Sequence, residues 1–295
     1  DASEWPPLPA LIQPTLHSAP GAPASLGTLL EARGNDLRGR MWSARLLRED
    51  PDEVRAAHAE FVEAGAEVLV TSSYQVAFDA GLDDAEVEQL LRRSVTLARE
   101  AGDVFVAASV GPYGAIRADG SEYTGDDGVE VDELRAFHRR RLEVMADAGA
   151  DALAIETIPS RVEVQALVAE LGRLGRPDLP VWISLSGGSS GFAAPGEMAA
   201  ALADAAEAPG VIAVGVNCCP PASVAAALAA RPQTTFGIAY PNSGEEWNAA
   251  ARVWTGTGRF PTEVAGAWID AGARLVGGCC RTTPAHIAAL SASLR

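Results

Sequence analysis

The chain contains no lysine. All 23 of its basic residues are arginine, in a sequence of 295 residues. This excludes mechanisms that use a lysine amine, such as Schiff-base catalysis, pyridoxal phosphate anchored on lysine, and a Walker-type phosphate loop. Histidine is also scarce, with four residues at positions 17, 58, 138 and 286. So few histidines argue against a zinc hydrolase built from several of them.

Positive charge and long apolar runs are in short supply as well. The 39 acidic residues outnumber the 23 basic ones, and the net charge is −16. Such a surface repels phosphate, so nucleic acid and anionic membranes are poor candidate partners, whereas a cationic small substrate is compatible with it. No apolar run approaches the roughly 20 residues of a membrane span. The N-terminus lacks the pattern of a secretory signal, and we therefore expect a cytoplasmic protein.

Cysteine is limited to four residues, which form two adjacent pairs, Cys218-Cys219 and Cys279-Cys280. Four cysteines in so long a chain do not make a disulfide scaffold. Neighbouring cysteines rarely bond to each other because the geometry is strained. The pattern therefore indicates a reduced protein with reactive or metal-binding thiols.

One unit recurs from Asp52 onward: a helical segment that ends in glycine, a short β-rich run, and a polar side chain. Nearly literal copies begin at Glu63, Asp147 and Asp270, and looser copies begin at Gly102 and Gly210. Glycine suits the position after a helix because it adopts the left-handed conformation at least cost. The residues seven positions after the five glycines are Ser72, Ser109, Glu156, Asn217 and Cys279.

This alternation predicts parallel strands joined by right-handed helical crossovers. Strands are expected near 67–72, 104–110, 152–156, 181–186, 211–217, 234–239 and 274–278, with a less distinct first strand near 10–16. Helices are expected near 52–64, 84–101, 131–148, 160–174, 196–206, 221–230, 262–271 and 284–293. We predict an α/β protein with a single (β/α)8 TIM barrel over residues 26–295, preceded by a proline-rich N-terminal arm, residues 1–25, which can include the first strand. An open doubly wound sheet is disfavoured because no glycine-rich phosphate loop follows a strand.

The paired cysteines follow two strands of this predicted barrel. Cys218 comes after the sixth strand, and Cys279 and Cys280 come after the eighth. Both strands flank the seventh, so the thiols can converge over one sector of the barrel mouth, where such barrels carry their chemistry. Zinc binds thiolates at about 2.3 Å, and catalytic sites keep one position open beside three protein ligands. The alternative, that these are small buried apolar side chains, is less favoured for two vicinal pairs.

The segments around these cysteines resemble the zinc-dependent homocysteine S-methyltransferases, relatives of betaine-homocysteine methyltransferase. The similarity rests on Gly215-Val-Asn-Cys-Cys-Pro, Tyr240-Pro-Asn-Ser-Gly-Glu and Gly277-Gly-Cys-Cys-Arg-Thr-Thr-Pro-Ala-His-Ile. It also includes Met41-Trp-Ser-Ala-Arg-Leu-Leu, Thr71-Ser-Ser-Tyr-Gln, Ser109-Val-Gly-Pro-Tyr-Gly and Glu156-Thr-Ile-Pro-Ser, and it runs from about Leu26 to the C-terminus. The family fold is a (β/α)8 barrel, in agreement with the repeats.

The resemblance implies one zinc ion (Zn2+) on Cys218, Cys279 and Cys280, with Cys219 as a neighbour of the site. In the family, zinc takes up the thiol of homocysteine as its fourth ligand. The thiolate then attacks a methyl group of S-methylmethionine or S-adenosylmethionine, which gives methionine. Metal binding suits this chemistry because a free thiol has a pKa near 8.5 and stays largely protonated at neutral pH, whereas a metal-bound thiol is deprotonated. No catalytic side chain beyond the zinc site and no organic cofactor are expected.

Five residues are expected to bind substrate. Glu156 lies where the family places a carboxylate for the substrate ammonium. Asn217 is expected to orient the zinc site or to bond substrate, with a structural turn as the alternative. Thr71, Ser72 and Gln75 are expected to line the end of the second strand.

Other polar residues are given structural roles. His58 is expected to pack on an apolar helix face, and His286 to lie near the start of the last helix. The three arginines from Arg139 to Arg141 are expected to form a solvated helix face.

One segment departs from the family pattern. The first strand of relatives ends in Asp-Gly-Gly, where this chain has Pro23-Ala24-Ser25, and Leu29 stands in place of a glutamate. Proline cannot replace an aspartate that binds the amino acid part of the acceptor. Two alternatives follow: the same chemistry with another thiol or selenol acceptor or another onium donor, and a non-enzymatic barrel that binds metal or senses oxidants.

Overall fold

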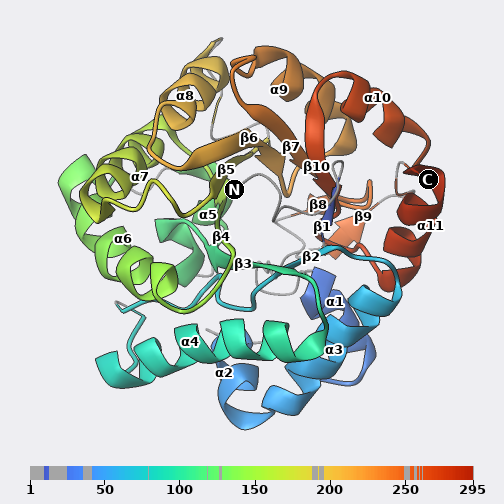
Figure 1. The fold of residues 1–295 in the computed structure, drawn as a ribbon, viewed down its shortest axis with the longest axis horizontal. Helices are drawn as coiled ribbons and strands as arrows, with labels where there is room; N and C mark the ends of the chain where they lie inside the picture. Colours follow the sequence, from blue (N-terminus) through green and yellow to red (C-terminus); the bar gives the residue numbers. More distant parts are fainter. Residues whose placement is uncertain are drawn as a thin grey trace.

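Eight parallel strands close into a barrel in a computed structural model of the chain (Figure 1). Its wall runs in the order β1-β10-β7-β6-β5-β4-β3-β2. The strands are β1 (Ala10–Ile12), β2 (Val68–Val70), β3 (Phe105–Val110), β4 (Ala152–Ile158), β5 (Val181–Ser186), β6 (Val211–Asn217), β7 (Phe236–Tyr240) and β10 (Ala273–Gly277). The structure describes residues 10–12, 25–35, 42–78, 80–117, 119–125, 128–187, 192, 196–248, 253–255, 258, 260 and 262–294.

Helices surround this wall. They are α1 (Ser25–Ala32), α2 (Trp42–Glu49), α3 (Pro51–Glu63), α4 (Asp84–Ala101), α5 (Ser121–Thr124), α6 (Val131–Ala146), α7 (Arg161–Leu174), α8 (Glu197–Ala206), α9 (Val224–Ala230), α10 (Ala265–Asp270) and α11 (Pro284–Leu294). Helix α3 begins as its sequence directs, with Pro51 in the first turn and the Asp50 carboxylate accepting from the Glu53 N–H. Among the helices that the structure describes, none combines the length and apolar composition that a bilayer crossing requires.

Apolar side chains fill two layers. Strand β4 shows the division, because Ala152 and Ala154 face the barrel interior while Leu153 and Ile155 join the layer under the helices. This alternation follows from the two-residue period of a strand. The interior is filled by Trp182 of β5, which is fully buried and whose indole N–H donates to the Tyr240 hydroxyl at 3.3 Å. The barrel is therefore packed below its mouth.

The predicted elements agree closely with the structure. The bounds of β5, β6 and α4 are those expected, and the first strand is β1, at Ala10–Ile12. The glycines of the repeat adopt positive φ after their helices, with one exception: the expected left-handed conformation is wrong at Gly102, whose φ is 170°. A Cβ there would lie 3.0 Å from Val62, so close packing explains the glycine. The division into an arm and a barrel stays a prediction, and Pro23 and Ala24 lie outside the described residues.

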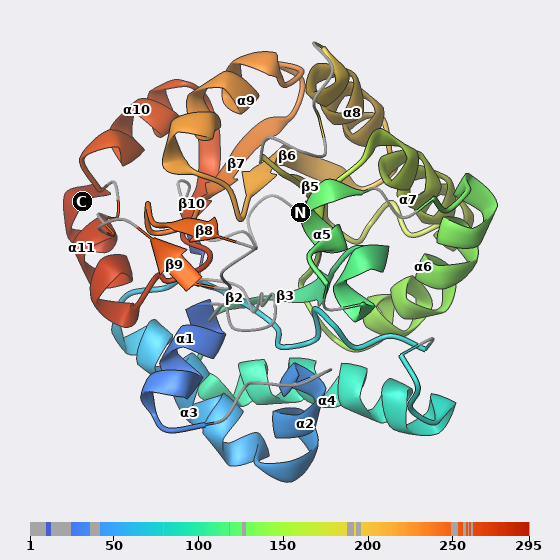
Figure 2. The ribbon, with the colours of Figure 1, turned by 180° about the vertical axis from the view of Figure 1, so that it is seen from behind.

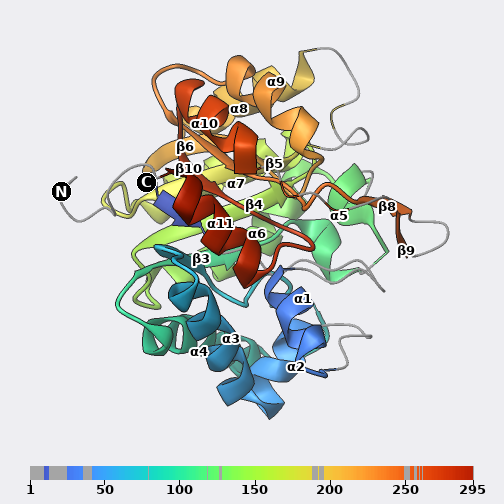
Figure 3. The same cartoon turned by 90° about the vertical axis from the view of Figure 1, so that its right-hand side faces the viewer.

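Several elements were not predicted. They are α1, α2, α5 and a hairpin of β8 (Glu246–Asn248) and β9 (Val253–Thr255). Figure 2 shows α5 and the hairpin in front of the barrel, and Figure 3 places both at the same end. Because α5 follows β3 and the hairpin follows β7, both belong to the carboxyl ends of the strands. They flank the end that carries the chemistry in such barrels.

The structural roles expected for the histidines are confirmed, because His58 is buried in α3 and His286 lies in the first turn of α11. The expectation of a solvated arginine face is wrong for Arg141, which is 1% exposed. Successive helical residues are rotated by about 100°, so three in a row cannot all face solvent. Arg141 donates to the carbonyls of Gly111 and Tyr74, at 2.9 and 3.1 Å, and burial lowers its pKa to about 10.

Candidate functional site

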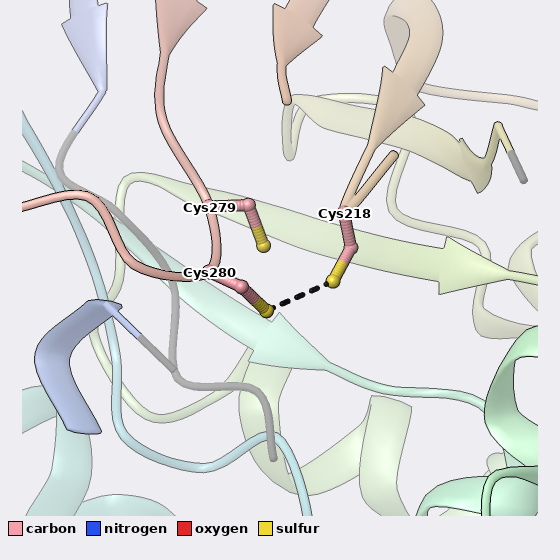
Figure 4. A group of neighbouring side chains, drawn as sticks. All are labelled: Cys218, Cys279 and Cys280. Carbon is pink, nitrogen blue, oxygen red and sulfur yellow. Dashed lines mark hydrogen bonds between the residues drawn. The ribbon is translucent and has the colours of Figure 1, made fainter. Parts of the chain in front are cut away.

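Three cysteine thiols meet at the mouth of the barrel (Figure 4). The Sγ atoms of Cys218, Cys279 and Cys280 all lie within 4.8 Å of one another, and those of Cys218 and Cys280 are 3.2 Å apart. Cys218 follows β6 directly, whereas Cys279 and Cys280 follow β10. Strand β7 pairs with both of these strands, so its two neighbours bring the thiols together as the spacing predicted.

The end of β7 and the loop that follows it hold both cysteine segments in place. Two carbonyls and one side chain of this segment accept three hydrogen bonds from cysteine N–H groups. The bonds run from Cys218 to the Tyr240 carbonyl at 3.3 Å, from Cys279 to the Pro241 carbonyl at 2.6 Å, and from Cys280 to Asn242 Oδ1 at 3.1 Å. The Tyr-Pro-Asn-Ser motif therefore acts as a bridge between the two halves of the thiol cluster.

Backbone strain accompanies the site. Among the described residues, three that are not glycine have a positive φ: Thr157 at 61°, Cys218 at 49° and Arg281 at 64°. They directly follow Glu156, Asn217 and Cys280. Such a conformation is uncommon, above all for a β-branched residue, and persists only where surrounding contacts enforce it. The backbone is therefore strained directly after three residues of the site, within β4 at Thr157 and after β6 and β10 at Cys218 and Arg281.

The thiol cluster fits a metal ion by its donor set and its spacing. A tetrahedral zinc ion with bonds of about 2.3 Å separates its sulfur ligands by about 3.8 Å, close to the spacing found here. Cys218 is 6% exposed and the other two thiols are buried. Burial raises the pKa of Cys279 well above its ordinary value, and a nearby dication would reverse that effect.

Cys219 lies outside this group. Its Sγ is buried, and a Cβ on Gly187 would lie only 3.1 Å from it. Burial raises the pKa of this thiol far above its ordinary value, which is the behaviour of a small apolar side chain.

Glu156 lies in β4 with a fully buried carboxylate. The Ser109 hydroxyl donates to Oε1 at 2.5 Å, and the Tyr240 hydroxyl donates to Oε2 at 3.1 Å. Burial, and after it the charge of Glu156, raises the pKa of the Tyr240 hydroxyl well above its ordinary value. The acid that the strand spacing singled out is thus held by hydroxyls beside the thiols.

Asn217 joins two strands of the barrel. Its Oδ1 accepts from the Thr157 N–H at 2.7 Å and from the Ser184 hydroxyl at 2.9 Å, while its Nδ2 donates to Thr157 Oγ1 at 2.8 Å. The Asn217 side chain therefore holds Thr157, the strained residue that follows Glu156, in place. Asn217 is the last residue of β6 and directly precedes the candidate ligand Cys218, and its role toward metal or substrate stays a prediction.

The three residues expected after the second strand are buried at the same mouth. Thr71 Oγ1 accepts from the Ser109 N–H at 2.9 Å, which links the end of β2 to β3. Gln75 donates to the Ala115 carbonyl at 3.3 Å. The Ser72 hydroxyl is buried without a hydrogen-bond partner among the described residues, so it has capacity to bond a ligand.

Sequence reasoning missed four residues of the mouth. Tyr240 lies within a quoted motif, and the network that it forms with Glu156, Ser184 and Trp182 depends on three strands. Tyr74 also lies within a quoted motif, whereas Glu122 and Tyr123 belong to the four-residue helix α5, which is too short to show a periodic pattern. A buried acid at position 122 could have been suspected only from its place between two glycines.

Comparisons with known proteins agree with the geometry. Residues 24–294 match the family model described as homocysteine S-methyltransferase. The homocysteine S-methyltransferase of Escherichia coli (strain K12) is 42% identical over 289 residues, which cover 91% of this chain and 93% of that protein. Homocysteine S-methyltransferase 4 of Zea mays is also 42% identical, over 92% of this chain and 87% of its own length.

Among solved structures, the metallated form of the homocysteine methyltransferase MmuM from Escherichia coli is similar, with a TM-score of 0.80 and 36% identity. The match covers 99% of this chain and 97% of that one. The likeness therefore extends through the whole barrel.

Proposed function

The chain belongs to the homocysteine S-methyltransferase family, and from this membership we propose that it transfers a methyl group from a sulfonium donor to the thiol of homocysteine, which yields methionine. The observation that carries the proposal is the convergence of Cys218, Cys279 and Cys280 at the barrel mouth. We propose S-methylmethionine or S-adenosylmethionine as the donor. The cytoplasm is the proposed compartment because thiols stay reduced there.

The three thiols are the proposed ligands of one zinc ion. Three thiolates with an open position are the donor set of a catalytic zinc site. When bound, zinc would hold the acceptor sulfur and favour its thiolate form. The protein sets the spacing of the three sulfur atoms. The hydrogen bonds that the cysteine N–H groups donate to Tyr240, Pro241 and Asn242 keep the two cysteine segments from moving apart.

The chemical step needs little more from the side chains. The acceptor thiolate forms a bond to the methyl carbon while the bond from that carbon to the donor sulfur breaks. The electron pair of the broken bond stays on the donor sulfur, so the sulfonium becomes a neutral thioether. No proton moves in this step, and alignment of two sulfur atoms with one carbon is the main requirement. This agrees with a chain that has no lysine and few histidines.

Glu156 is the proposed partner of the acceptor ammonium. Two hydroxyls, from Ser109 and Tyr240, orient its carboxylate, and the site is buried, so an ammonium would bind in a desolvated environment. Asn217 is proposed as a positioning residue through Thr157, while Thr71, Ser72 and Gln75 line the same mouth.

The test is one reaction. Purified protein loaded with zinc is incubated with homocysteine and S-methylmethionine, and methionine is measured. Formation of methionine that stops on chelation and resumes with zinc supports the proposal. A parallel reaction replaces S-methylmethionine with S-adenosylmethionine. No methionine with either donor, together with methylation of another thiol or a selenol, would assign that compound as the acceptor instead. Bound metal with no methyl transfer to any acceptor would indicate a metal-binding or thiol-sensing barrel instead.

A further inference from the structure

A second buried carboxylate lies at the barrel mouth, apart from Glu156. Glu122 in α5 is 1% exposed. Its Oε2 atom is buried and, among the described residues, has no hydrogen-bond partner. A buried charge without a counterion is costly, so such a group in a functional site calls for a ligand of opposite charge.

Helix α5 is fixed firmly enough to present this carboxylate. It packs against the short 3-10 helix η2 (Tyr113–Ile116) and against β4. A Cβ on Gly114 would lie 2.5 Å from the Glu122 nitrogen, and Gly125, at φ 63°, ends the helix against Ser160. Both contacts require glycine, and together they set the position of Glu122 relative to the wall of the barrel.

The surroundings of Glu122 connect it to the thiol cluster. The adjacent Tyr123 brings its hydroxyl to 3.7 Å from the Sγ of Cys218. Burial, with a smaller contribution from the Cys218 thiol and against the lowering effect of backbone N–H groups, raises the pKa of Glu122 to about 8. Without a cation the acid is therefore largely protonated near neutral pH, and a bound cation would favour the charged carboxylate. Tyr74 is buried in the segment after β2, and burial raises its pKa well above the ordinary value. The helix that carries Glu122 therefore reaches the thiol cluster through Tyr123, whose hydroxyl lies beside Cys218.

We propose that Glu122 binds the positive sulfur of the methyl donor, an inference that rests on the proposed methyl transfer. A sulfonium has no N–H or O–H group, so it is recognised by a negative charge and by aromatic rings. Glu122 supplies the charge, and the adjacent Tyr123 supplies a ring whose hydroxyl lies beside Cys218. The methyl carbon must also approach an acceptor sulfur held beside Cys218, and these residues are its neighbours. Glu156, already held by two hydroxyls, remains for the acceptor.

This assignment has a kinetic consequence. The attraction between Glu122 and the donor is strongest before transfer, when the donor sulfur is positive. It vanishes once that sulfur becomes a neutral thioether. The carboxylate therefore favours donor binding over the transition state and over the product, and its loss should raise the KM for the donor without lowering kcat.

The experiment compares zinc-loaded wild type with Glu122→Gln and Glu122→Asp, with exposed Glu207→Gln at the end of α8 as the matched control. In Glu122→Gln we expect the KM for S-methylmethionine to rise by about tenfold or more. The KM for homocysteine, kcat and zinc content should stay within about twofold, a difference that is small on this scale. Glu122→Asp, which keeps the charge, should fall between wild type and Glu122→Gln, and Glu207→Gln should match wild type.

Direct titration separates this inference from the proposed function. Wild type should bind S-methylmethionine more tightly than methionine, its neutral thioether counterpart, and Glu122→Gln should lose that preference. An unchanged donor KM and preference in Glu122→Gln would overturn the inference while leaving methyl transfer intact. A rise in the KM for homocysteine instead would assign Glu122 to the acceptor. A wild type that makes no methionine would overturn the proposed function, and the titration would still decide whether Glu122 recognises the sulfonium.

Discussion

Two groups of side chains at the barrel mouth, which we call the thiol side and the carboxylate side, solve different problems of recognition. On the thiol side, Cys218, Cys279 and Cys280 point at one another, with two of their sulfur atoms 3.2 Å apart. On the carboxylate side, Glu156 and Glu122 lie on separate elements, each with its own surroundings. A small cation that accepts several ligands needs convergence, whereas two cationic organic substrates need carboxylates kept apart. In the proposed function, one barrel end would hold a metal ion through the thiols and two substrates through the carboxylates.

The largest effect is expected when one of the three thiols is removed. In Cys279→Ala we expect zinc to fall from about one ion per chain to nearly none, and methyl transfer to be lost, because two thiolates do not complete the site. Cys218→Ala and Cys280→Ala should behave alike. Elemental analysis of dialysed protein measures the metal. A variant that keeps its full zinc content would show that its cysteine is not a ligand.

Removal of one carboxylate should affect substrate use and spare the metal. Glu156→Ala is expected to lower kcat/KM for homocysteine by at least about a hundredfold, roughly 2.7 kcal/mol, because a buried ammonium loses its partner. Steady-state kinetics at saturating donor measure this effect, with zinc content as the control. Full activity in this variant would mean that the true acceptor does not present an ammonium here.

The link between the two sides can be weakened separately. Asn217→Ala leaves the buried N–H of Thr157 without its acceptor, and we expect the free energy of unfolding to fall by about 1–3 kcal/mol. Adding Thr157→Gly should recover part of that loss, since glycine adopts positive φ without steric strain. Urea unfolding of the single and double variants measures the coupling. Losses that simply add would show that Asn217 does not restrain the turn.

The smallest effect is expected at Cys219, which is next to Cys218 in the chain but is not one of the three proposed ligands. Cys219→Ala should retain its zinc and activity and lose about 1 kcal/mol of stability, because a small buried group is removed from a packed layer. Thermal unfolding and elemental analysis measure both quantities. A loss of zinc equal to that in Cys279→Ala would refute the assignment of three ligands.

The sequence predicted the thiol side more fully than the carboxylate side. Cys218, Cys279 and Glu156 lie at or just after strand ends. The repeat predicts where each strand starts, and it therefore also predicts which residues lie at the strand's carboxyl end. Glu122 lies in a four-residue helix whose position depends on contacts with Gly114 and Ser160. Arg141 was misjudged for a related reason, since its burial depends on the carbonyls of Gly111 and Tyr74. Contacts between distant segments leave no local period in a sequence.

The left-handed backbone of Cys218 carries a consequence for engineering. At φ 49°, glycine would relieve the turn, yet glycine has no thiol. Selection for heat resistance and selection for catalysis therefore favour different residues at position 218. Thr157 and Arg281 have the same left-handed backbone conformation. A library screened for survival at high temperature alone would drift toward glycine at these turns and accumulate stable but inactive enzymes. A screen that requires methionine production after heating would retain the strained residues, because it selects for activity as well as for stability.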